Sequence, residues 1–134
     1  MGVWGVGNIE NDYAWDELEE RSNKLVRALL KRAKKKTGQH FDMDDHYILF
    51  VEFEIVFAFE SRGLLCAPLP IPTEIEDLKL KFVKGWLKSF TEESCASEDT
   101  INDRERVIVN TFNKFKRICK KYHEKNEQNV RALE

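Results

Sequence analysis

The sequence predicts an all-α fold, with about four helices packed around a central apolar helix and a glycine-rich N-terminal loop folded onto the core. Three observations favour this class. Apolar residues recur at spacings of three and four across residues 14–33 and again across residues 101–122, as on the buried face of a helix. Thr73 and Glu76 have the spacing of a capping box in front of a third amphipathic segment. The 134 residues, 42% hydrophobic and 34% charged, suit a single helical domain over residues 1–134.

The first element is expected to be a loop over residues 1–10 that is followed by a long helix. Three glycines interrupt the loop, and Asn11 or Asp12 occupies the position of a helix N-cap. Acidic residues gather near the start of the helix and basic residues near its end, which complements the helix dipole. We therefore expect a helix that ends near Gly38, a typical C-cap residue.

Residues 46–61 are ambiguous, because their aromatic and β-branched side chains alternate as they do in a strand. The segment nevertheless runs for sixteen residues without a turn signal. Asp44 or Asp45 offers an N-cap, and Gly63 follows where a helix would end. We interpret the segment as a helix that is apolar enough to require contact on most sides.

The second half of the chain is predicted to hold two more helices. An extended connector over residues 67–72 leads into a helix that starts at Thr73. Residues 92–99 are polar and acidic and are expected to form a loop. A long fourth helix follows, and we expect residues 124–134 to be a frayed tail.

Charge and cysteine content favour a reducing, aqueous compartment. The net charge of -2 gives no overall field toward nucleic acid or an anionic bilayer. Cys66, Cys95 and Cys119 include no CxxC pair, so we expect neither a disulfide framework nor a thiolate zinc site. Neither a signal peptide nor a membrane span is recognisable. The sequence thus predicts a cytoplasmic protein with no cofactor and no membrane partner.

Two clusters that could carry chemistry are better explained by structure. Carboxylates and imidazoles gather in the segment HFDMDDH, but their spacing matches no metal site and suits a solvated helix cap. The cluster consists of His40, Asp42, Asp44, Asp45 and His46. Cys119 and His123 would share one helix face, yet Cys119 falls on the apolar stripe, which favours a core thiol over a nucleophile. Without an HExxH or GxSxG motif, we assign no catalytic, cofactor-binding or metal-binding residue.

The fourth helix is basic, with aromatic residues interleaved, which is the composition of a nucleic-acid-binding face. The aromatic residues lie on the predicted buried stripe, however, and basic residues near a helix C-terminus complement the helix dipole. We therefore expect no nucleic-acid partner.

The opening MGVWGVGNIENDYAWDEL resembles the start of a family of small bacterial proteins, the domain of unknown function 4259 family, whose members begin MGxWGxGxFxNDxAxDxL. Ile9 stands where the family has phenylalanine. The segment FEIVFAFESRG, residues 53–63, is similar to the family's AAEVVAAxxG segment on its second helix, which places Glu54 on the family's glutamate. The resemblance implies an all-α fold and supplies no reaction, substrate or cofactor.

We expect the protein to act by stoichiometric protein binding, most concretely as an immunity- or antitoxin-like protein that neutralises a bacterial toxin. The chain is small and motif-free, and its acidic segments could face a basic nuclease, since complementary charge speeds encounter. The candidate partner-binding residues are Asp42, Asp44, Asp45, Glu92, Glu93, Glu98 and Asp99. The alternative is a small enzyme or ligand-binding domain with a pocket beside Glu54.

Glu54 is also expected to hold the N-terminal loop on the core. Glu52 and Glu54 lie about 200° apart around the helix axis, so one of the two has to point inward. A buried carboxylate needs hydrogen-bond donors, and the loop offers backbone amides, an indole and asparagine side chains. The predicted staple consists of Trp4, Asn8, Asn11, Asp12 and Glu54.

Overall fold

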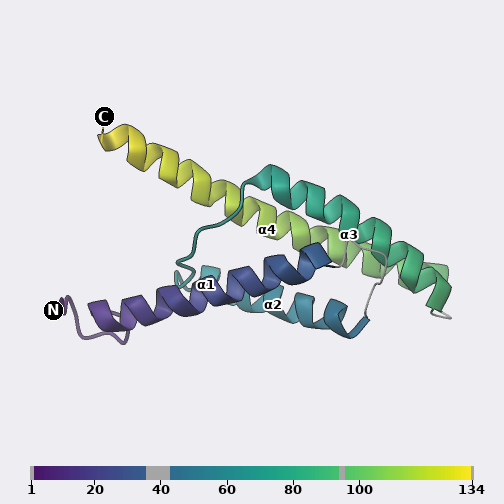
Figure 1. Ribbon diagram of the computed structural model, residues 1–134, viewed down its shortest axis with the longest axis horizontal. Coiled ribbons are helices and arrows are strands. Elements are labelled where there is room, and N and C mark those ends of the chain that lie inside the picture. Colours follow the sequence, from purple (N-terminus) through teal and green to yellow (C-terminus); the bar gives the residue numbers. More distant parts are fainter. Residues whose placement is uncertain (1, 36–42, 94–95, 134) are drawn as a thin grey trace.

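The computed structural model describes residues 2–35, 43–93 and 96–133, which form four helices (Figure 1). The helices are α1 (Asp12–Lys35), α2 (Met43–Ser61), α3 (Pro72–Glu93) and α4 (Glu98–Leu133). Over these residues no strand forms, and the one bridge-type pairing joins Val3 to Asn11. The predicted all-α class is confirmed, and residues 46–61 are helical rather than extended.

The four helices form two helical hairpins that lie against each other (Figure 1). Helix α1 packs on α2 and α3 packs on α4, while contacts of α1 with α3 and of α2 with α4 join the hairpins. In Figure 1, α2 and α4 both run toward the end of the molecule where the two termini lie. These two neighbouring helices are therefore parallel, so the first turns of α2 lie beside the first turns of α4.

Aromatic side chains from three helices fill the centre of the core. The Phe53 ring of α2 contacts the Phe112 ring of α4 with centroids 5.0 Å apart, and Phe112 contacts Phe82 of α3 at 5.3 Å. Helix α1 adds the aliphatic side chains of Val26 and Leu29. Aromatic rings bury the largest apolar area per side chain, so this cluster is what holds the two hairpins together.

Helix α1 begins where the sequence predicts. Asn11 caps it, because its Oδ1 accepts a hydrogen bond from the backbone N–H of Ala14 at 2.8 Å. The buried residues of α1 keep the predicted spacing of three and four. The helix reaches Lys35, and the expected C-cap Gly38 lies outside the described residues.

Helix α2 ends in a Schellman motif around Gly63, whose φ of 69° favours glycine. The backbone N–H of Leu64 donates to the Phe59 carbonyl at 2.8 Å, and that of Gly63 donates to the Glu60 carbonyl at 3.0 Å. The end signal predicted at Gly63 is therefore confirmed.

Helix α2 is less enclosed than its composition suggests. Leu49, Phe53 and Val56 are fully buried, whereas Val51 is 59% exposed and Ile55 is 40% exposed. The expectation of contact on most sides is wrong, because apolar residues cover the whole circumference while α1 and α4 cover its inner side. An apolar outer face is left uncovered.

Helix α3 begins one residue before the predicted capping box. Its first residue is Pro72, whose missing N–H and fixed φ suit this position. The Glu76 carboxylate does not turn back toward Thr73, since it pairs with Lys79 at 2.8 Å and with Lys116 at 3.1 Å. The capping-box prediction is wrong because two lysines compete for the glutamate.

The acidic loop predicted over residues 92–99 is shorter than expected. Helix α3 continues to Glu93, and α4 already begins at Glu98. The hydroxyl oxygen of Ser97 accepts a hydrogen bond from the backbone N–H of Thr100 at 3.2 Å and so caps α4. A serine cap inside the acidic segment was not among the predicted signals.

The last part of α4 projects beyond the other helices (Figure 1). The helix continues to Leu133, so the predicted frayed tail over residues 124–134 is helical as far as the structure describes it. Its side chains are exposed. Backbone hydrogen bonds rather than packing therefore hold this segment.

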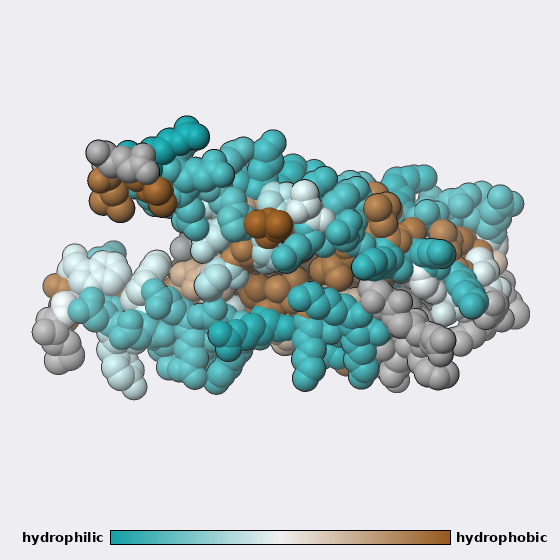
Figure 2. Space-filling view, turned by 45° about the horizontal axis from the view of Figure 1, so that its top comes forward, coloured by the Kyte–Doolittle hydropathy of each residue, from teal (hydrophilic) through white to brown (hydrophobic). Residues whose placement is uncertain are grey.

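Hydrophilic side chains dominate the face shown in Figure 2, and apolar side chains gather in a band between the two hairpins. Over the part of the chain that is described, none of the four helices combines the length and apolar character of a membrane-spanning segment.

Candidate functional site

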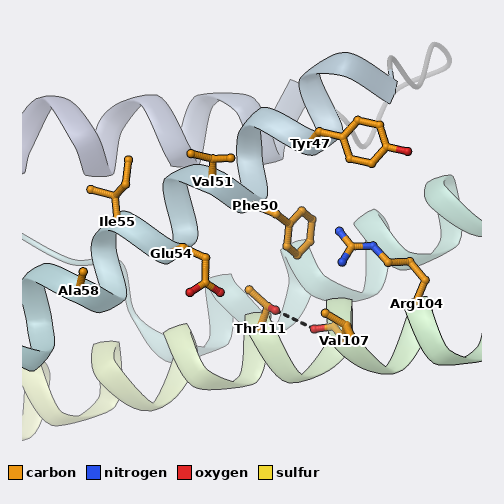
Figure 3. Close-up of a pocket in the computed structure, with 9 residues that line it drawn as sticks. All are labelled: Tyr47, Phe50, Val51, Glu54, Ile55, Ala58, Arg104, Val107 and Thr111. Carbon is orange, nitrogen blue, oxygen red and sulfur yellow. Dashed lines mark hydrogen bonds between the residues drawn. The ribbon is translucent and has the colours of Figure 1, made fainter.

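An open, mostly apolar groove lies between α2 and α4 (Figure 3). Its volume is about 530 Å³. Its lining consists of Tyr47, Phe50, Val51, Glu54, Ile55, Ala58, Arg104, Val107 and Thr111. The groove therefore lies where the uncovered face of α2 meets the parallel helix α4.

A regular apolar seam runs along α2 beside the groove, and we define it as Ile48, Val51, Ile55 and Ala58. The last three residues line the groove, and Ile48 continues the seam beyond it. These residues are three, four and three positions apart, which is the spacing of a coiled-coil heptad. All four are exposed. Val107 of α4 is 48% exposed and extends the apolar surface across the groove. Such a seam has the form of a helix face that packs on another helix.

Arg104 of α4 supplies the cation of the groove. Its guanidinium lies 4.7 Å from the centroid of the Phe50 ring, and its Nη2 donates to Nε2 of His46 at 3.1 Å. Burial lowers the pKa of Arg104, although arginine stays charged at neutral pH. Within the described residues Arg104 forms no ion pair with a carboxylate.

Glu54 of α2 supplies the anion of the groove. Figure 3 shows its carboxylate between α2 and α4, near Thr111. The Glu54 side chain is exposed and, over the described part of the chain, has no ion-pair partner. The Thr111 hydroxyl donates to the backbone carbonyl of Val107 at 2.7 Å. The groove thus holds one cation and one anion for which the described residues offer no ion-pair partner.

The groove has little that could catalyse a reaction. Glu54 is a single, solvated carboxylate, and the Thr111 hydroxyl already serves the helix backbone. Among the described residues that line the groove there is no histidine or cysteine that could form a nucleophile-and-base pair with Glu54. The pocket predicted beside Glu54 exists, but its lining suits contact with an apolar surface.

The inward-pointing glutamate of α2 is Glu52, not Glu54. The Glu52 residue is 9% exposed, and its Oε1 accepts a hydrogen bond from Nε of Arg32 at 2.6 Å. Nη1 of Arg32 donates to Oδ1 of Asp45 at 2.7 Å, and Lys35 lies 3.5 Å from the same carboxylate. The bond to Glu52 raises the pKa of Arg32. The Arg32 cluster, defined as Arg32, Asp45 and Glu52, therefore joins α1 to α2.

The predicted staple between Glu54 and the N-terminal loop is wrong. The loop instead binds the start of α1, where the Asp12 carboxylate accepts hydrogen bonds from the Gly2 amide at 2.9 Å and from the Trp4 indole at 3.1 Å. A Cβ on Gly2 would lie 2.5 Å from Asp12 Oδ2, so a larger residue there would have to displace the Asp12 carboxylate from this position.

The other residues of the predicted staple do not meet at one place. Asn11 is the N-cap of α1, as described above. The Asn8 side chain is exposed. Trp4 is 55% exposed and lies edge-on to Trp15 of α1, with ring centroids 6.1 Å apart. The loop therefore caps one helix rather than folding onto the core, because Asp12 offers a nearer acceptor than Glu54.

His46 is a core residue that the sequence reasoning placed in a polar cap. It is 1% exposed and lies against Phe82 and Trp86, with ring centroids 5.5 Å and 6.5 Å away. Burial, with a contribution from the charge of Arg104, lowers the pKa of His46 to about 4. Its apolar neighbours in sequence, Tyr47 and Leu49 onward, were the available signal for an inward position.

The suspected metal cluster does not assemble among the residues that can be described. Asp45 belongs to the Arg32 cluster, whereas His46 points into the aromatic core. His40, Asp42 and the Asp44 side chain lie outside the description. Within the described ranges, no group of three or more histidine, cysteine or acidic side chains could hold a metal ion.

The proposed partner-binding acids are also dispersed. Glu98 and Asp99 are exposed in the first turn of α4. Asp45 is held by Arg32 and is not available to a partner. The side chains of Asp42, Asp44, Glu92 and Glu93 lie outside what the structure describes.

Cys119 and His123 do not form a reactive pair. Cys119 is fully buried, and burial raises the pKa of its thiol to about 12. His123 Nε2 donates to the Leu69 carbonyl at 2.9 Å and so ties α4 to the connector before α3. The predicted core thiol is therefore confirmed, and Cys95 lies outside the described residues.

We predict that Cys119 of the native protein resists alkylation at neutral pH. A thiol with a pKa near 12 holds very little thiolate, so its reaction with iodoacetamide should be at least about a hundredfold slower than that of half-buried Cys66. Peptide mass spectrometry after timed alkylation measures both rates, and denatured protein serves as the control in which the rates converge. Equal native rates would contradict the burial of Cys119.

Comparison with family models, with curated proteins and with solved structures finds no match to this chain. The groove and the contacts around it are therefore the basis for a function.

Proposed function

We propose that this protein works by binding another protein chain through the groove between α2 and α4. The observation that carries the proposal is the apolar seam, in which Val51 is 59% exposed and Ile55 is 40% exposed beside an open groove of about 530 Å³. Exposed apolar surface of this kind lowers the free energy of association when a partner covers it.

A protein partner fits the groove better than a small molecule does. Sites for small molecules are concave, bury most of the ligand and converge several polar groups on it. This groove is open, and among the described residues that line it Arg104 and Glu54 are the charged ones. The heptad spacing of the seam instead matches the regular face of a helix.

The narrower form of the proposal is an immunity- or antitoxin-like role, in which the bound partner is a toxin domain. Such an inhibitor needs no catalytic residue, since occlusion alone blocks the toxin. The exposed Glu98 and Asp99 would attract a basic partner during encounter. The resemblance of the N-terminal residues to a small bacterial family agrees with a bacterial setting and adds no activity.

The test compares the wild-type chain with Val51→Asp, which places a charge in the centre of the seam. Val130→Asp is the matched control, because Val130 is 57% exposed near the end of α4 and lies outside the groove. Affinity-tagged chains are expressed in the source cells, and recovered proteins, including untagged copies of this chain, are quantified by mass spectrometry.

We expect wild type and Val130→Asp to recover the same protein in a fixed ratio, and Val51→Asp to recover about tenfold less, because a buried unpaired charge is costly. Circular dichroism verifies that both variants stay helical. Equal recovery by Val51→Asp, or no protein in a fixed ratio with wild type, would contradict a binding role of the groove. Loss of growth protection against a co-expressed toxin tests the narrower form.

A further inference from the structure

We propose that the partner seated on the groove is a second copy of this chain, related by a two-fold axis that sets α2 antiparallel to the partner's α2. The inference rests on the proposed function, because it uses the same surface. It adds the identity of the partner and the register of the two helices.

The apolar seam is suited to pairing with itself. An antiparallel pairing centred between Val51 and Ile55 places Val51 against the partner's Ile55 and Ile48 against the partner's Ala58. Each seam residue thus meets an apolar residue, as in the heptad contacts of antiparallel helices. A closed two-fold pair also covers both seams at once, so no further copy can add to the assembly.

The two unpaired charges of the groove are placed for exchange between two copies. Arg104 lies against Phe50, and Glu54 follows Phe50 by one turn of α2. In the antiparallel register, residue 56 of one α2 helix faces Phe50 of the partner's α2 helix. Glu54 is two residues from residue 56, about 3 Å along the axis, which arginine and glutamate side chains can span.

The direction of the symmetry axis decides the lateral position of the charges. An axis that lies in the interface and crosses α2 keeps α4 and the partner's α4 on the same side of the seam. Figure 3 shows Glu54 on the α4 side of α2, where Arg104 also lies. Each Glu54 carboxylate therefore approaches the partner's Arg104 guanidinium, which gives two symmetric ion pairs.

The alternative symmetric pairing, with parallel α2 helices, leaves the same charges unpaired. Its two-fold axis runs along α2 and sets α4 and the partner's α4 on opposite sides of the seam. Arg104 and Glu54 of one copy then lie across the apolar seam from those of the other copy, so no ion pair forms between the copies. The charges therefore select one of the two symmetric arrangements that could cover the seam.

The test measures self-association of the purified full chain by sedimentation equilibrium. We expect wild type to form a dimer, and Glu54→Arg and Arg104→Glu each to raise the dimer dissociation constant by at least about tenfold. Chains with Glu54→Arg mixed with chains with Arg104→Glu should form a one-to-one heterodimer, because both contacts then join opposite charges. Arg117→Glu, a reversal at an exposed position of α4 outside the groove, is the control and should leave the dimer unchanged.

Arg104 also contacts His46 and Phe50, so thermal melts establish whether Arg104→Glu folds. If it does not, a double-mutant cycle of Glu54→Gln and Arg104→Gln measures the same coupling. Two results overturn the proposal: a wild-type monomer at millimolar concentration, or a dimer that neither charge reversal weakens. The wild-type chain could sediment as a monomer and still recover a different protein in the affinity experiment, with that recovery lost in Val51→Asp. This result would contradict pairing with a second copy but would support the proposed function.

Discussion

Replacing Arg32 by methionine is expected to lower the free energy of unfolding by about 2 to 3 kcal/mol, because the buried Glu52 carboxylate then loses its charged hydrogen-bond donor. The guanidinium bridges two carboxylates on α2, with Glu52 at 2.6 Å and Asp45 at 2.7 Å. The Glu52 side chain is only 11% exposed, so without Arg32 its carboxylate stays buried next to an apolar methionine. Chemical denaturation followed by circular dichroism measures the change.

Arg27→Met is the matched control for this experiment. Arg27 lies on the exposed face of the same helix, so its loss should change stability by less than about 0.5 kcal/mol. The double variant Arg32→Met with Glu52→Gln should be more stable than the sum of the single effects predicts, because the uncompensated charge is then gone. If Arg32→Met costs no more than Arg27→Met, the cluster does not join α1 to α2 in solution.

The second large effect is a pH dependence that belongs to His46. Its pKa is lowered from the ordinary value of 6.5 to about 4 in the folded protein, first by burial and then by the charge of Arg104. Between pH 4 and pH 6.5, His46 is mostly protonated in the unfolded chain and mostly neutral in the folded protein. The stability contributed by neutral His46 is therefore complete above pH 6.5 and is lost as the pH falls toward 4.

The measurement compares unfolding of wild type and His46→Gln across this pH range. The glutamine does not titrate, so the carboxylates common to both proteins cancel in the difference. Wild type should lose about 3 kcal/mol relative to the variant on going from neutral pH to pH 4, since one pKa unit is worth about 1.4 kcal/mol. Parallel stability curves would show that His46 is not held neutral in the core.

The helical fold was predictable, because periodicity and end signals in the sequence reflect local physics. Helix α2 shows this most clearly. The length of the segment and the end signal at Gly63 favoured a helix although the side chains alternate as in a strand, and the segment is helical. The start of α3 was missed by one residue, because Pro72 was assigned to the connector although proline suits the first helical position.

The choice between Glu52 and Glu54 could not be made from the helix itself. Their angular separation says that one points inward, but the cation that decides it, Arg32, comes from another helix. Arg32 stands beside buried Ala33 on α1, which was a weak signal that it could face α2. Sequence reasoning favoured Glu54 because the resemblance drew attention to it.

A pocket beside Glu54 was predicted, but its open apolar seam was not, for a related reason. The apolar residues of α2 are too many for one face, and which of them stay exposed depends on how the hairpins pair. His46 was misplaced because three acidic residues, Asp42, Asp44 and Asp45, closely precede it in the sequence, while its ring packs on residues from α3. Such tertiary information is absent from local spacing.

The connector between α2 and α3 has a consequence for how the molecule comes apart. Ser22 of α1 donates to the Leu64 carbonyl at 3.2 Å, and His123 of α4 donates to the Leu69 carbonyl at 2.9 Å. The connector is thus hydrogen-bonded to both hairpins, so the hairpins cannot separate without breaking these partly buried hydrogen bonds and the aromatic cluster together. Opening and global unfolding then become the same cooperative event, and the slowest-exchanging amides of all four helices should share one protection energy.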